Sequence, residues 1–253
     1  MNMHIVINGY KGRMGRALID CALRSHDIVV VGTIDIDNKI GYVIRNADVV
    51  IDFSNRIAIL ELVDKCVLHR KPLVIGTTGH SISEMNYIEH HSANIPIVLA
   101  SNFSTGVNTL FWLTRKAAEI LGPDFDLEIV EMHHRMKMDA PSGTAKTLAN
   151  VLAEVRKQST AAHPATVFQY GRVGDCEKRN SEVIGIHCVR GGDIVGEHTV
   201  IFAGDGERIE LTHKASSRKT FARGALLAAR WVLTQKPGLY SMEHVLGLTQ
   251  PPI

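Results

Sequence analysis

The sequence has no hydrophobic run that approaches the roughly 20 apolar residues of a membrane-spanning helix. Cysteine is scarce: the 253-residue chain has 4, and none forms a Cys-x-x-Cys pair. A disulfide framework is therefore not expected, and a reducing compartment fits best. No signal-peptide pattern precedes the first strand-like segment. We therefore expect a cytoplasmic protein without a membrane partner.

The chain also lacks an excess of charge of either sign. Its 28 Lys and Arg and 26 Asp and Glu leave a formal net charge of +2, and the basic residues are dispersed among acidic ones. A protein that binds nucleic acid would gather basic residues into a patch, so we expect no nucleic-acid partner. Hydrophobic residues make up 45% of the chain and charged residues 21%, which indicates an ordinary globular protein.

The order of the predicted elements indicates two domains. In the first part of the chain, short runs of Val, Ile and Leu alternate with amphipathic stretches, which is typical of βαβ units and a doubly wound parallel sheet. After residue 105, strands follow one another across short glycine-bearing connections. That pattern favours an α+β domain with an open mixed or antiparallel sheet. The expected fold class is therefore α/β, with one doubly wound domain and one α+β domain.

Hydrophobic periodicity predicts the individual elements. The expected strands cover residues 4–8, 28–33, 49–53, 73–75, 97–100, 126–133, 182–189, 197–202 and 207–213. The expected helices cover residues 13–24, 56–69, 81–91, 105–121, 143–158 and 220–235. The clearest boundaries are Ser81 to Glu84, which has the spacing of a capping box, and Gly122-Pro123, which ends a helix.

A glycine-rich turn lies between the first expected strand and the first expected helix. Gly9, Gly12 and Gly15 have the spacing G-x-x-G-x-x-G, which departs from the usual G-x-G-x-x-G fingerprint. Glycines permit a tight turn and let a pyrophosphate approach the N–H groups of a helix N-terminus. Asp35 ends the second strand about 20 residues further on, where an acid binds the adenosine ribose. The pattern predicts a dinucleotide site, and a glycine turn without a ligand is the alternative.

Two further loops follow expected strands, at the edge where ligands bind to parallel sheets. Residues 76–79 read Gly-Thr-Thr-Gly, and residues 100–103 read Ala-Ser-Asn-Phe. Their hydroxyls, small side chains and amide suit contacts with a nicotinamide and its ribose. Because loops rich in Thr and Gly are also common without a function, the residues themselves leave both interpretations open.

Residues 131–145 carry the most informative pattern in the chain. They read Glu-Met-His-His-Arg-Met-Lys-Met-Asp-Ala-Pro-Ser-Gly-Thr-Ala, from a strand end through a basic loop to a helix N-terminus. Ser142 is a good N-cap, which leaves the amides of Gly143 and Thr144 pointing outward. These amides, the hydroxyl and Lys137 suit a carboxylate, and a neighbouring histidine suits proton delivery. The segment predicts a pocket for an anionic substrate that is protonated as it reacts.

Other interpretations of this segment stay open. Adjacent residues of an extended segment point to opposite faces, so His133 and His134 need not share a task. No H-E-x-x-H or Cys/His spacing accompanies them, and a metal site is not expected. A semialdehyde or homoserine dehydrogenase-like enzyme is one rival, although the former would need an activated cysteine. A nucleotide-sensing module that has lost catalysis is the other rival.

The string E-x-H-H-x-x-K-x-D-A-P-S-G-T-A resembles the signature of the dihydrodipicolinate reductase family. The chain carries the whole string in register at residues 131–145. Similar segments span nearly the whole chain in the same order, at residues 12–15, 52–54, 76–79, 102–108, 190–198 and 213–218. The departures are mild: Lys11 stands where a small residue is common, and the stretch after Asp35 is short.

The resemblance implies an NAD(P)H-dependent oxidoreductase that reduces 4-hydroxy-tetrahydrodipicolinate to tetrahydrodipicolinate in diaminopimelate and lysine biosynthesis. It implies a homotetramer, a Rossmann-type cofactor domain over residues 1–104 completed by residues 216–253, and a substrate-binding and tetramerisation domain over residues 105–215. It makes His133 the proton donor, assisted by Lys137. The small dicarboxylate substrate would be held by His134, Lys137, Ser142, Gly143, Thr144 and Arg218. The cofactor would be lined by Gly9, Tyr10, Lys11, Gly12, Arg13, Met14, Asp35, Gly76, Thr77, Thr78, Ala100, Ser101, Asn102 and Phe103.

Charge near the expected adenosine pocket bears on the choice between NADH and NADPH. Asp35 and Asp37 oppose a 2′-phosphate, whereas Lys11 and Lys39 attract one. Lysine does so as a flexible point charge, without the bidentate geometry of arginine. We therefore expect both cofactors to be accepted, with NADH at least as good as NADPH and a preference within about tenfold.

Overall fold

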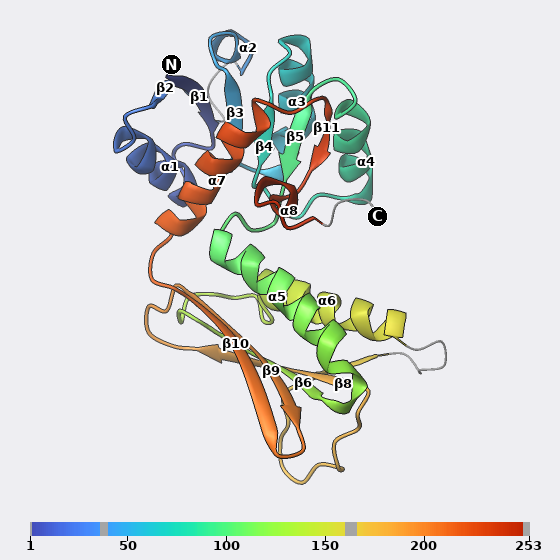
Figure 1. The fold of residues 1–253 in the computed structure, drawn as a ribbon. Coiled ribbons are helices and arrows are strands. Elements are labelled where there is room, and N and C mark those ends of the chain that lie inside the picture. The colour runs from blue at the N-terminus through green and yellow to red at the C-terminus, as the bar shows by residue number, and fades with distance from the viewer. Residues whose placement is uncertain (1, 36–39, 160–165, 250–253) are drawn as a thin grey trace. The chain divides into compact units, whose positions relative to one another are not determined.

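A computed structural model describes residues 2–35, 40–159 and 166–249. The chain divides into two compact units (Figure 1). The first unit comprises Met1–Thr105 and Arg218–Ile253, and the second comprises Gly106–Ser217. Asp37 and Lys39, which bear on the expected cofactor preference, lie outside the described residues.

The first unit is a parallel six-stranded sheet with helices on both faces (Figure 1). The strand order is β11-β5-β4-β3-β1-β2. The strands are β1 (Met3–Asn8), β2 (Ile28–Ile34), β3 (Val49–Asp52), β4 (Leu73–Ile75), β5 (Pro96–Leu99) and β11 (Gly238–Tyr240). The helices are α1 (Arg13–Leu23), α2 (Ile40–Ile44), the 3-10 turn η1 (Arg56–Ala58), α3 (Ile59–Leu68), α4 (Ile82–His91), α7 (Lys219–Val232) and α8 (Met242–Val245). Because β2 and β3 lie on opposite sides of β1, the chain order reverses at β1, where ligands bind to such sheets.

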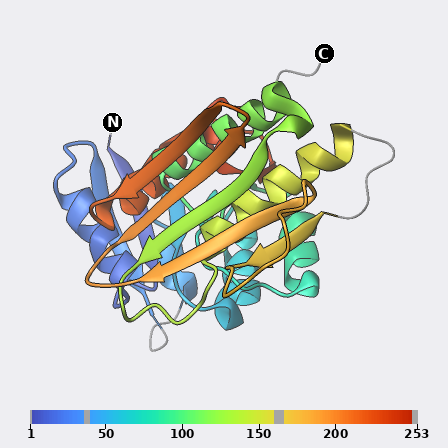
Figure 2. The same ribbon diagram turned by 90° about the horizontal axis from the view of Figure 1, so that it is seen from below.

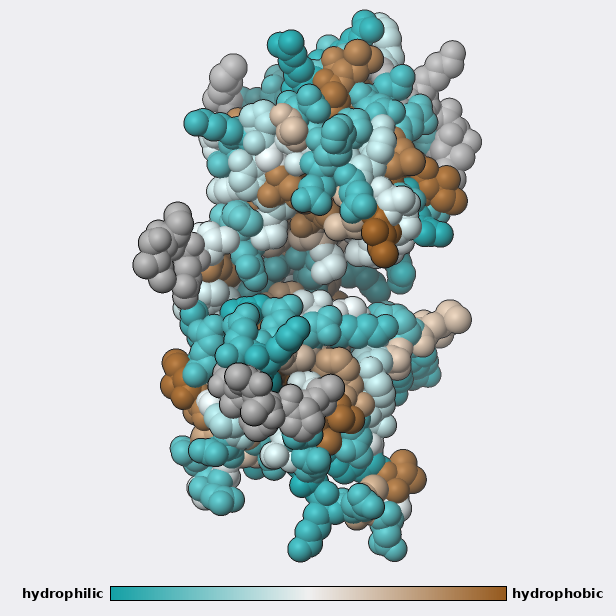
Figure 3. Space-filling view, turned by 90° about the vertical axis from the view of Figure 1, so that its right-hand side faces the viewer, coloured by the Kyte–Doolittle hydropathy of each residue, from teal (hydrophilic) through white to brown (hydrophobic). Residues whose placement is uncertain are grey.

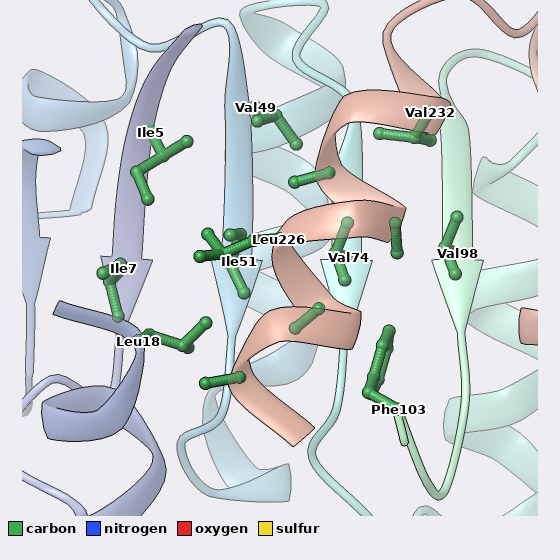
Figure 4. Close-up of a cluster of buried hydrophobic side chains, with 14 of the residues drawn as sticks. Ile5, Ile7, Leu18, Val49, Ile51, Val74, Val98, Phe103, Leu226 and Val232 are labelled. Atoms are coloured by element: carbon green, nitrogen blue, oxygen red, sulfur yellow. The ribbon is translucent and has the colours of Figure 1, made fainter. Parts of the chain in front are cut away.

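Alternation along β1 supplies both hydrophobic layers of this unit. Ile5 and Ile7 point to one face, where they pack with Leu18 of α1 and Leu226 of α7 (Figure 4). Val6 points to the other face, into the cluster that α2, α3 and α4 cover. A strand that is covered on both faces has a nearly continuous apolar sequence, as β1 has.

The second unit is a five-stranded mixed sheet with two helices on one face. The strand order is β10-β9-β6-β8-β7, and β6, β8 and β7 are parallel while β9 and β10 are antiparallel to their neighbours. The strands are β6 (Asp126–His133), β7 (Val167–Tyr170), β8 (Val183–Arg190), β9 (Gly196–Gly204) and β10 (Glu207–Ala215). The helices are α5 (Thr105–Leu121), the 3-10 turn η2 (Gly122–Asp124) and α6 (Gly143–Ser159). Figure 2 shows the face of this sheet that lies opposite α5 and α6. The predicted α/β fold with a second mixed sheet is confirmed.

The helix-covered face of β6 changes from apolar to polar along the strand. Every second residue of β6 is buried. Leu127 and Ile129 belong to the apolar cluster under α5 and α6. Glu131 and His133 continue the same face beyond that cluster. The alternation that builds the core therefore also carries two ionisable side chains into a buried position.

Hydrophobic residues on the outside are dispersed. On the face shown in Figure 3, they are scattered among polar residues. Among the residues that the structure describes, the most exposed large hydrophobic residue is Met138, at 98%, in the loop that follows β6. Among the described residues, no helix has the length and apolar composition needed to cross a membrane.

The sequence patterns miss four short elements: α2, α8, β7 and β11. Each has at most five residues, too few to display a periodicity. β11 and β7 form through pairing with β5 and β8, which lie elsewhere in the sequence. The helix expected over residues 56–69 begins as the 3-10 turn η1, where the Asn55 side chain accepts a hydrogen bond from the Ile57 amide at 3.1 Å.

Gly224 lets α7 lie close to the chain that follows β5. A Cβ at this position would come within 1.7 Å of the Phe103 carbonyl oxygen, which is backbone and cannot turn aside. We expect Gly224→Ala to lower the free energy of unfolding by about 1–3 kcal/mol, measured by urea denaturation. Gly191→Ala is the control, because a Cβ there meets nothing within 4 Å. Equal stability of the two variants would contradict the packing argument.

Candidate active site

The glycine turn between β1 and α1 is closely packed against the sheet. Gly9 has φ +80°, and a Cβ there would lie 2.4 Å from the Phe53 carbonyl oxygen. A Cβ on Gly15 would lie 2.3 Å from the Gly9 carbonyl oxygen. On the outside, α1 begins after Gly12 with no side-chain cap and no acidic residue in its first turn. The helix therefore presents N–H groups and a positive dipole end that suit a phosphate.

Asp35 lies beside this turn. Its Oδ2 accepts a hydrogen bond from the Lys11 amide at 3.2 Å. Lys11, Gly12 and Arg13 are exposed, and Tyr10 is half-buried. The structure thus brings together the acid and the glycine turn, which are separated in sequence by β2 and α1. Close packing, a helix N-terminus and a nearby acid fit a bound dinucleotide.

A buried carboxylate joins the ends of β1, β3 and β4. Asp52 is 1% exposed and accepts hydrogen bonds from Asn8 Nδ2 at 2.7 Å, Ser54 Oγ at 2.6 Å and Thr77 Oγ1 at 2.6 Å. Burial raises the pKa of Asp52, although these three hydrogen bonds oppose the rise. Thr77 Oγ1 also accepts from the Ser54 amide at 2.9 Å, so this predicted cofactor-binding hydroxyl holds the loop together. Thr78, the next residue, is exposed.

Gly76 and residues 100–103, which were also predicted to contact the cofactor, differ in how exposed they are. The Phe103 ring is 1% exposed and makes a T-shaped contact with Phe53, with centroids 5.5 Å apart. That ring belongs to the hydrophobic core, so a cofactor contact from Phe103 would have to come from its backbone. Gly76 also packs on Phe53, because a Cβ there would lie 2.2 Å from that ring. Ser101 is exposed, and Ala100 and Asn102 are half-buried.

In the second unit, Glu131 is the centre of a buried polar cluster. Its side chain has no exposed surface. Oε2 accepts from His133 Nδ1 at 2.5 Å and from Arg190 Nη1 at 2.8 Å. Oε1 accepts from Arg190 Nη2 at 2.7 Å and from the Ser142 amide at 3.1 Å. Burial alone would raise the pKa of Glu131, but the hydrogen bonds from His133, Arg190 and Ser142 outweigh it and hold that pKa below its usual range.

The Glu131 carboxylate determines which nitrogen of His133 carries a proton. An ionised carboxylate can only accept, so His133 Nδ1 carries a proton and donates it. Nε2 is then the nitrogen left for chemistry. A Cβ on Gly196 of β9 would lie 3.0 Å from this Nε2, so glycine at that position keeps the space beside it open.

The predicted carboxylate-binding turn begins α6. Ser142 Oγ accepts from the Ala145 amide at 3.2 Å, which makes Ser142 the N-cap. Gly143 is exposed, and a Cβ there would meet nothing within 4 Å. Thr144 is half-buried. The turn therefore has open space directly in front of the helix N-terminus, where an anion is favoured.

The remaining predicted substrate residues lie in different surroundings. Lys137 Nζ donates to both carboxylate oxygens of Asp139, at 2.8 and 3.0 Å. His134 is half-buried, and its carbonyl oxygen accepts from the Lys137 amide at 3.1 Å. Arg218 belongs to the first unit, where it precedes α7.

His198 is a site residue that sequence reasoning missed. Its ring on β9 makes a T-shaped contact with the His133 ring, with centroids 5.2 Å apart. Its Nε2 lies 3.0 Å from Ser142 Oγ. Burial, and then the charge of His133, lower the pKa of His198 to about 3, so the ring is neutral near neutral pH.

Strand pairing explains which residues were missed. His198 lies opposite Glu131 in the antiparallel pair, and Arg190 lies opposite His133 in the parallel pair. Neither partnership is visible in the sequence. The alternation along the strand expected over residues 126–133 does place Glu131 on the same face as His133, and this signal could have identified it.

A parallel sheet with a glycine turn at its reversal point, and a second unit with a carboxylate-anchored histidine, define a nicotinamide-dependent oxidoreductase. Two family models match the chain: dihydrodipicolinate reductase, N-terminus, over residues 3–103, and dihydrodipicolinate reductase, C-terminus, over residues 106–246. The chain belongs to the dihydrodipicolinate reductase family.

Individual relatives agree with this assignment. The chain is 52% identical over 246 residues to the 4-hydroxy-tetrahydrodipicolinate reductase of Akkermansia muciniphila, covering 97% of this chain and 98% of the relative. It is 42% identical over 271 residues to the enzyme of that name from Saccharophagus degradans, covering 98% and 100%. A dipicolinate-bound dihydrodipicolinate reductase from a Paenisporosarcina species has the same fold, with a TM-score of 0.77 at 24% identity over 95% of this chain and 98% of that one.

The neutral, buried His198 makes the fold sensitive to acid. Its pKa is about 3 in the folded chain, against an ordinary 6.5. As the pH falls, the His198 side chain therefore becomes protonated in the unfolded chain before it does in the folded chain. The contribution of neutral His198 to the free energy of unfolding is complete above about pH 6.5 and is lost as the pH falls toward 3. The loss is at most about 1.4 kcal/mol per pH unit. We expect the free energy of unfolding of His198→Phe to fall less steeply between pH 6.5 and 4 than that of the unchanged protein. Equal slopes in urea titrations would contradict this.

Proposed function

We propose that the protein is a cytoplasmic 4-hydroxy-tetrahydrodipicolinate reductase of diaminopimelate and lysine biosynthesis. The observation that carries the proposal is the arrangement around His133: its Nδ1 is anchored by Glu131, while its Nε2 faces the space left by Gly196. Relatives with this name match nearly the whole chain at 52% and 42% identity, which supports the same activity.

The substrate is a ring with two carboxylates, and the second unit offers donors for them. The open N-terminus of α6 supplies the Ser142 hydroxyl and the Gly143 and Thr144 amides for one carboxylate. His134 and Lys137 supply further donors. Lys137 uses two hydrogen bonds on Asp139, and an ammonium group has three donors. The family resemblance adds Arg218, which precedes α7, to the proposed carboxylate ligands.

The residues that hold the cofactor lie in the first unit. The N-terminus of α1, with Gly9–Met14, binds the pyrophosphate, and Asp35 binds the adenosine ribose. The nicotinamide end is held by Gly76 and Thr78 and by the backbone of Thr77, together with residues 100–103. When bound, the nicotinamide cofactor supplies the hydride.

His133 supplies or relays the proton. After the substrate hydroxyl leaves as water, the ring is a conjugated imine, and addition of hydride to a ring carbon moves electron density toward the imine nitrogen. A proton must then be added, and His133 delivers it from Nε2. The buried Glu131 carboxylate stabilises the protonated ring through Nδ1, and Arg190 keeps that carboxylate in place. Lys137 and the α6 N-terminus stabilise the carboxylates and the developing negative charge.

Two of the four cysteines, Cys66 and Cys188, lack the activation that a semialdehyde dehydrogenase requires. Such an enzyme needs a thiol whose pKa is lowered by its surroundings. Burial raises the pKa of Cys66 instead. Burial, followed by the neighbouring Glu131, raises the pKa of Cys188 to about 11.

The central test is His133→Ala in a coupled assay that follows nicotinamide absorbance with the lysine-pathway substrate. We expect kcat to fall about 10²–10⁴-fold, as for loss of a general acid, while cofactor affinity is unchanged. His187→Ala is the matched control, because His187 lies on the other face of the same sheet and bonds Glu128. Unchanged turnover in His133→Ala would remove His133 from the chemistry, and no turnover by the unchanged protein would refute the proposed function.

The second prediction concerns cofactor choice. We expect kcat/KM for NADH to be at least equal to that for NADPH, with a difference within about tenfold, because the Asp35 carboxylate beside the glycine turn opposes a 2′-phosphate. Lys11→Ala should shift the ratio further toward NADH. A preference for NADPH above a hundredfold that survives Lys11→Ala and Lys39→Ala would mean that the adenosine pocket lies elsewhere.

The third prediction concerns assembly. β10 is a nine-residue strand at the edge of the second sheet, and exposed edges favour pairing with another chain. We propose a homotetramer built through the second unit. Light scattering at micromolar concentration should give four times the chain mass, and a monomer mass would contradict the proposal.

A further inference from the structure

We propose that His198 is a positioning residue for Ser142. It donates a hydrogen bond to the Ser142 hydroxyl oxygen, which leaves the hydroxyl proton for the substrate carboxylate. The inference rests on the proposed function, in which Ser142 binds that carboxylate. Ser142 lies at the N-terminus of α6 and His198 on β9, and the 3.0 Å contact between Nε2 and Oγ joins the two elements. Both side chains are buried, with 2% and 4% exposure.

The hydrogen bond between Ser142 Oγ and His198 Nε2 can have either of two directions. A hydroxyl has one proton to donate and two lone pairs to accept with. One lone pair accepts the Ala145 amide. In the first arrangement, His198 Nε2 donates to the second lone pair, which leaves the hydroxyl proton for a ligand. In the second arrangement, the hydroxyl donates its proton to Nε2.

The surroundings of the His198 ring favour the first arrangement. Its Nδ1 is buried and has no hydrogen-bond partner among the described residues. If Ser142 donated to Nε2, the neutral ring would carry its proton on Nδ1, as a buried N–H without an acceptor. A buried N–H without a partner is rarer and costlier than a buried acceptor without one. Nε2 therefore carries the proton and donates to Ser142 Oγ.

Burial is the main reason that His198 stays neutral, because it lowers the pKa of the ring. The charges of His133 on β6, His213 on β10 and Lys137 in the loop after β6 lower this pKa further, whereas the Glu131 carboxylate opposes them. The His133 ring, 5.2 Å away, must carry a positive charge before it gives up its proton. A second positive ring beside it would oppose that charge, so a buried neutral histidine is compatible with proton delivery from its neighbour.

The Ser142 hydroxyl is then a hydrogen-bond donor with a fixed direction. With both lone pairs of Ser142 Oγ occupied, its proton is left for a ligand at the N-terminus of α6, where Gly143 is exposed. A carboxylate, which only accepts, is favoured there, and a ligand that presents a donor to Oγ is not. His198 thus contributes to the choice of an anionic substrate without touching it.

Binding of pyridine-2,6-dicarboxylate, a planar mimic of the substrate, tests this by calorimetry. We expect His198→Phe to weaken binding about fivefold, as for the loss of one hydrogen bond. His198→Gln, whose amide can donate from a similar position, should restore most of the affinity. Thr199→Val is the matched control on the other face of β9, where Thr199 contacts Thr212. Unchanged or tighter binding by His198→Phe would overturn the inference, because the opposite arrangement predicts that result.

A double-mutant cycle separates this inference from the proposed function. In the Ser142→Ala background, His198→Phe should have no further effect on binding, and an undiminished effect would assign His198 a merely structural role. Full affinity of Ser142→Ala would instead refute the proposed carboxylate-binding turn itself. If Ser142→Ala weakens binding and His198→Phe does not, only the inference fails.

The tautomer can also be measured directly in the unchanged protein. Nitrogen-15 NMR of labelled histidine distinguishes a ring protonated on Nε2 from one protonated on Nδ1. We expect the His198 resonances, assigned by their absence from His198→Gln, to show an Nε2 proton that persists when pyridine-2,6-dicarboxylate binds. A proton on Nδ1 would overturn the inference.

Discussion

The polar cluster of the second unit, and the chemistry that we propose for it, depend on one buried carboxylate. Glu131 accepts four hydrogen bonds, which satisfy both of its oxygens, and these bonds join β6 to β8 and to the start of α6. Arg190 donates in addition to the Asp139 carbonyl oxygen at 2.7 Å, so the loop between β6 and α6 is held by the same cluster. Removing one partner from a buried ion pair of this kind costs about 3–5 kcal/mol. The histidine and the turn beside it are therefore positioned before any ligand arrives.

The first unit uses a buried carboxylate in a similar place. Asp52 lies at the end of β3 and accepts from side chains that follow or end β1 and β4. These strand ends carry the loops that we assign to the cofactor. In both units, the alternation that buries apolar residues along a strand also brings one acid into the interior at the strand's end, where hydrogen bonds from neighbouring loops satisfy it. The loops are thus fixed by the same elements that form the core.

Much of the fold was predictable because long elements have strong periodicity. The strands over residues 126–133 and 73–75 have the predicted bounds, and the helix over residues 105–121 does as well. β11 was not predictable, because three residues that include Gly238 form a strand only through pairing with β5. In the candidate site, the prediction placed Ser142 correctly as an N-cap, since capping depends on neighbours in sequence. The engagement of the Thr77 hydroxyl by Asp52 and the burial of Phe103 depend on contacts between distant segments, and they were not visible.

The sequence by itself determined the family, the alternation of strands and helices, and the local motifs that we propose to bind phosphate and carboxylate groups. These features depend on residues close together in the chain, where periodicity, capping and glycine spacing act. Only the tertiary structure decided that Arg190 and His198 join Glu131 and His133, and which nitrogen of His133 bonds Glu131. Those relations arise from the register of β8 and β9 against β6, and register is set by packing of the whole sheet under its helices rather than by any one segment.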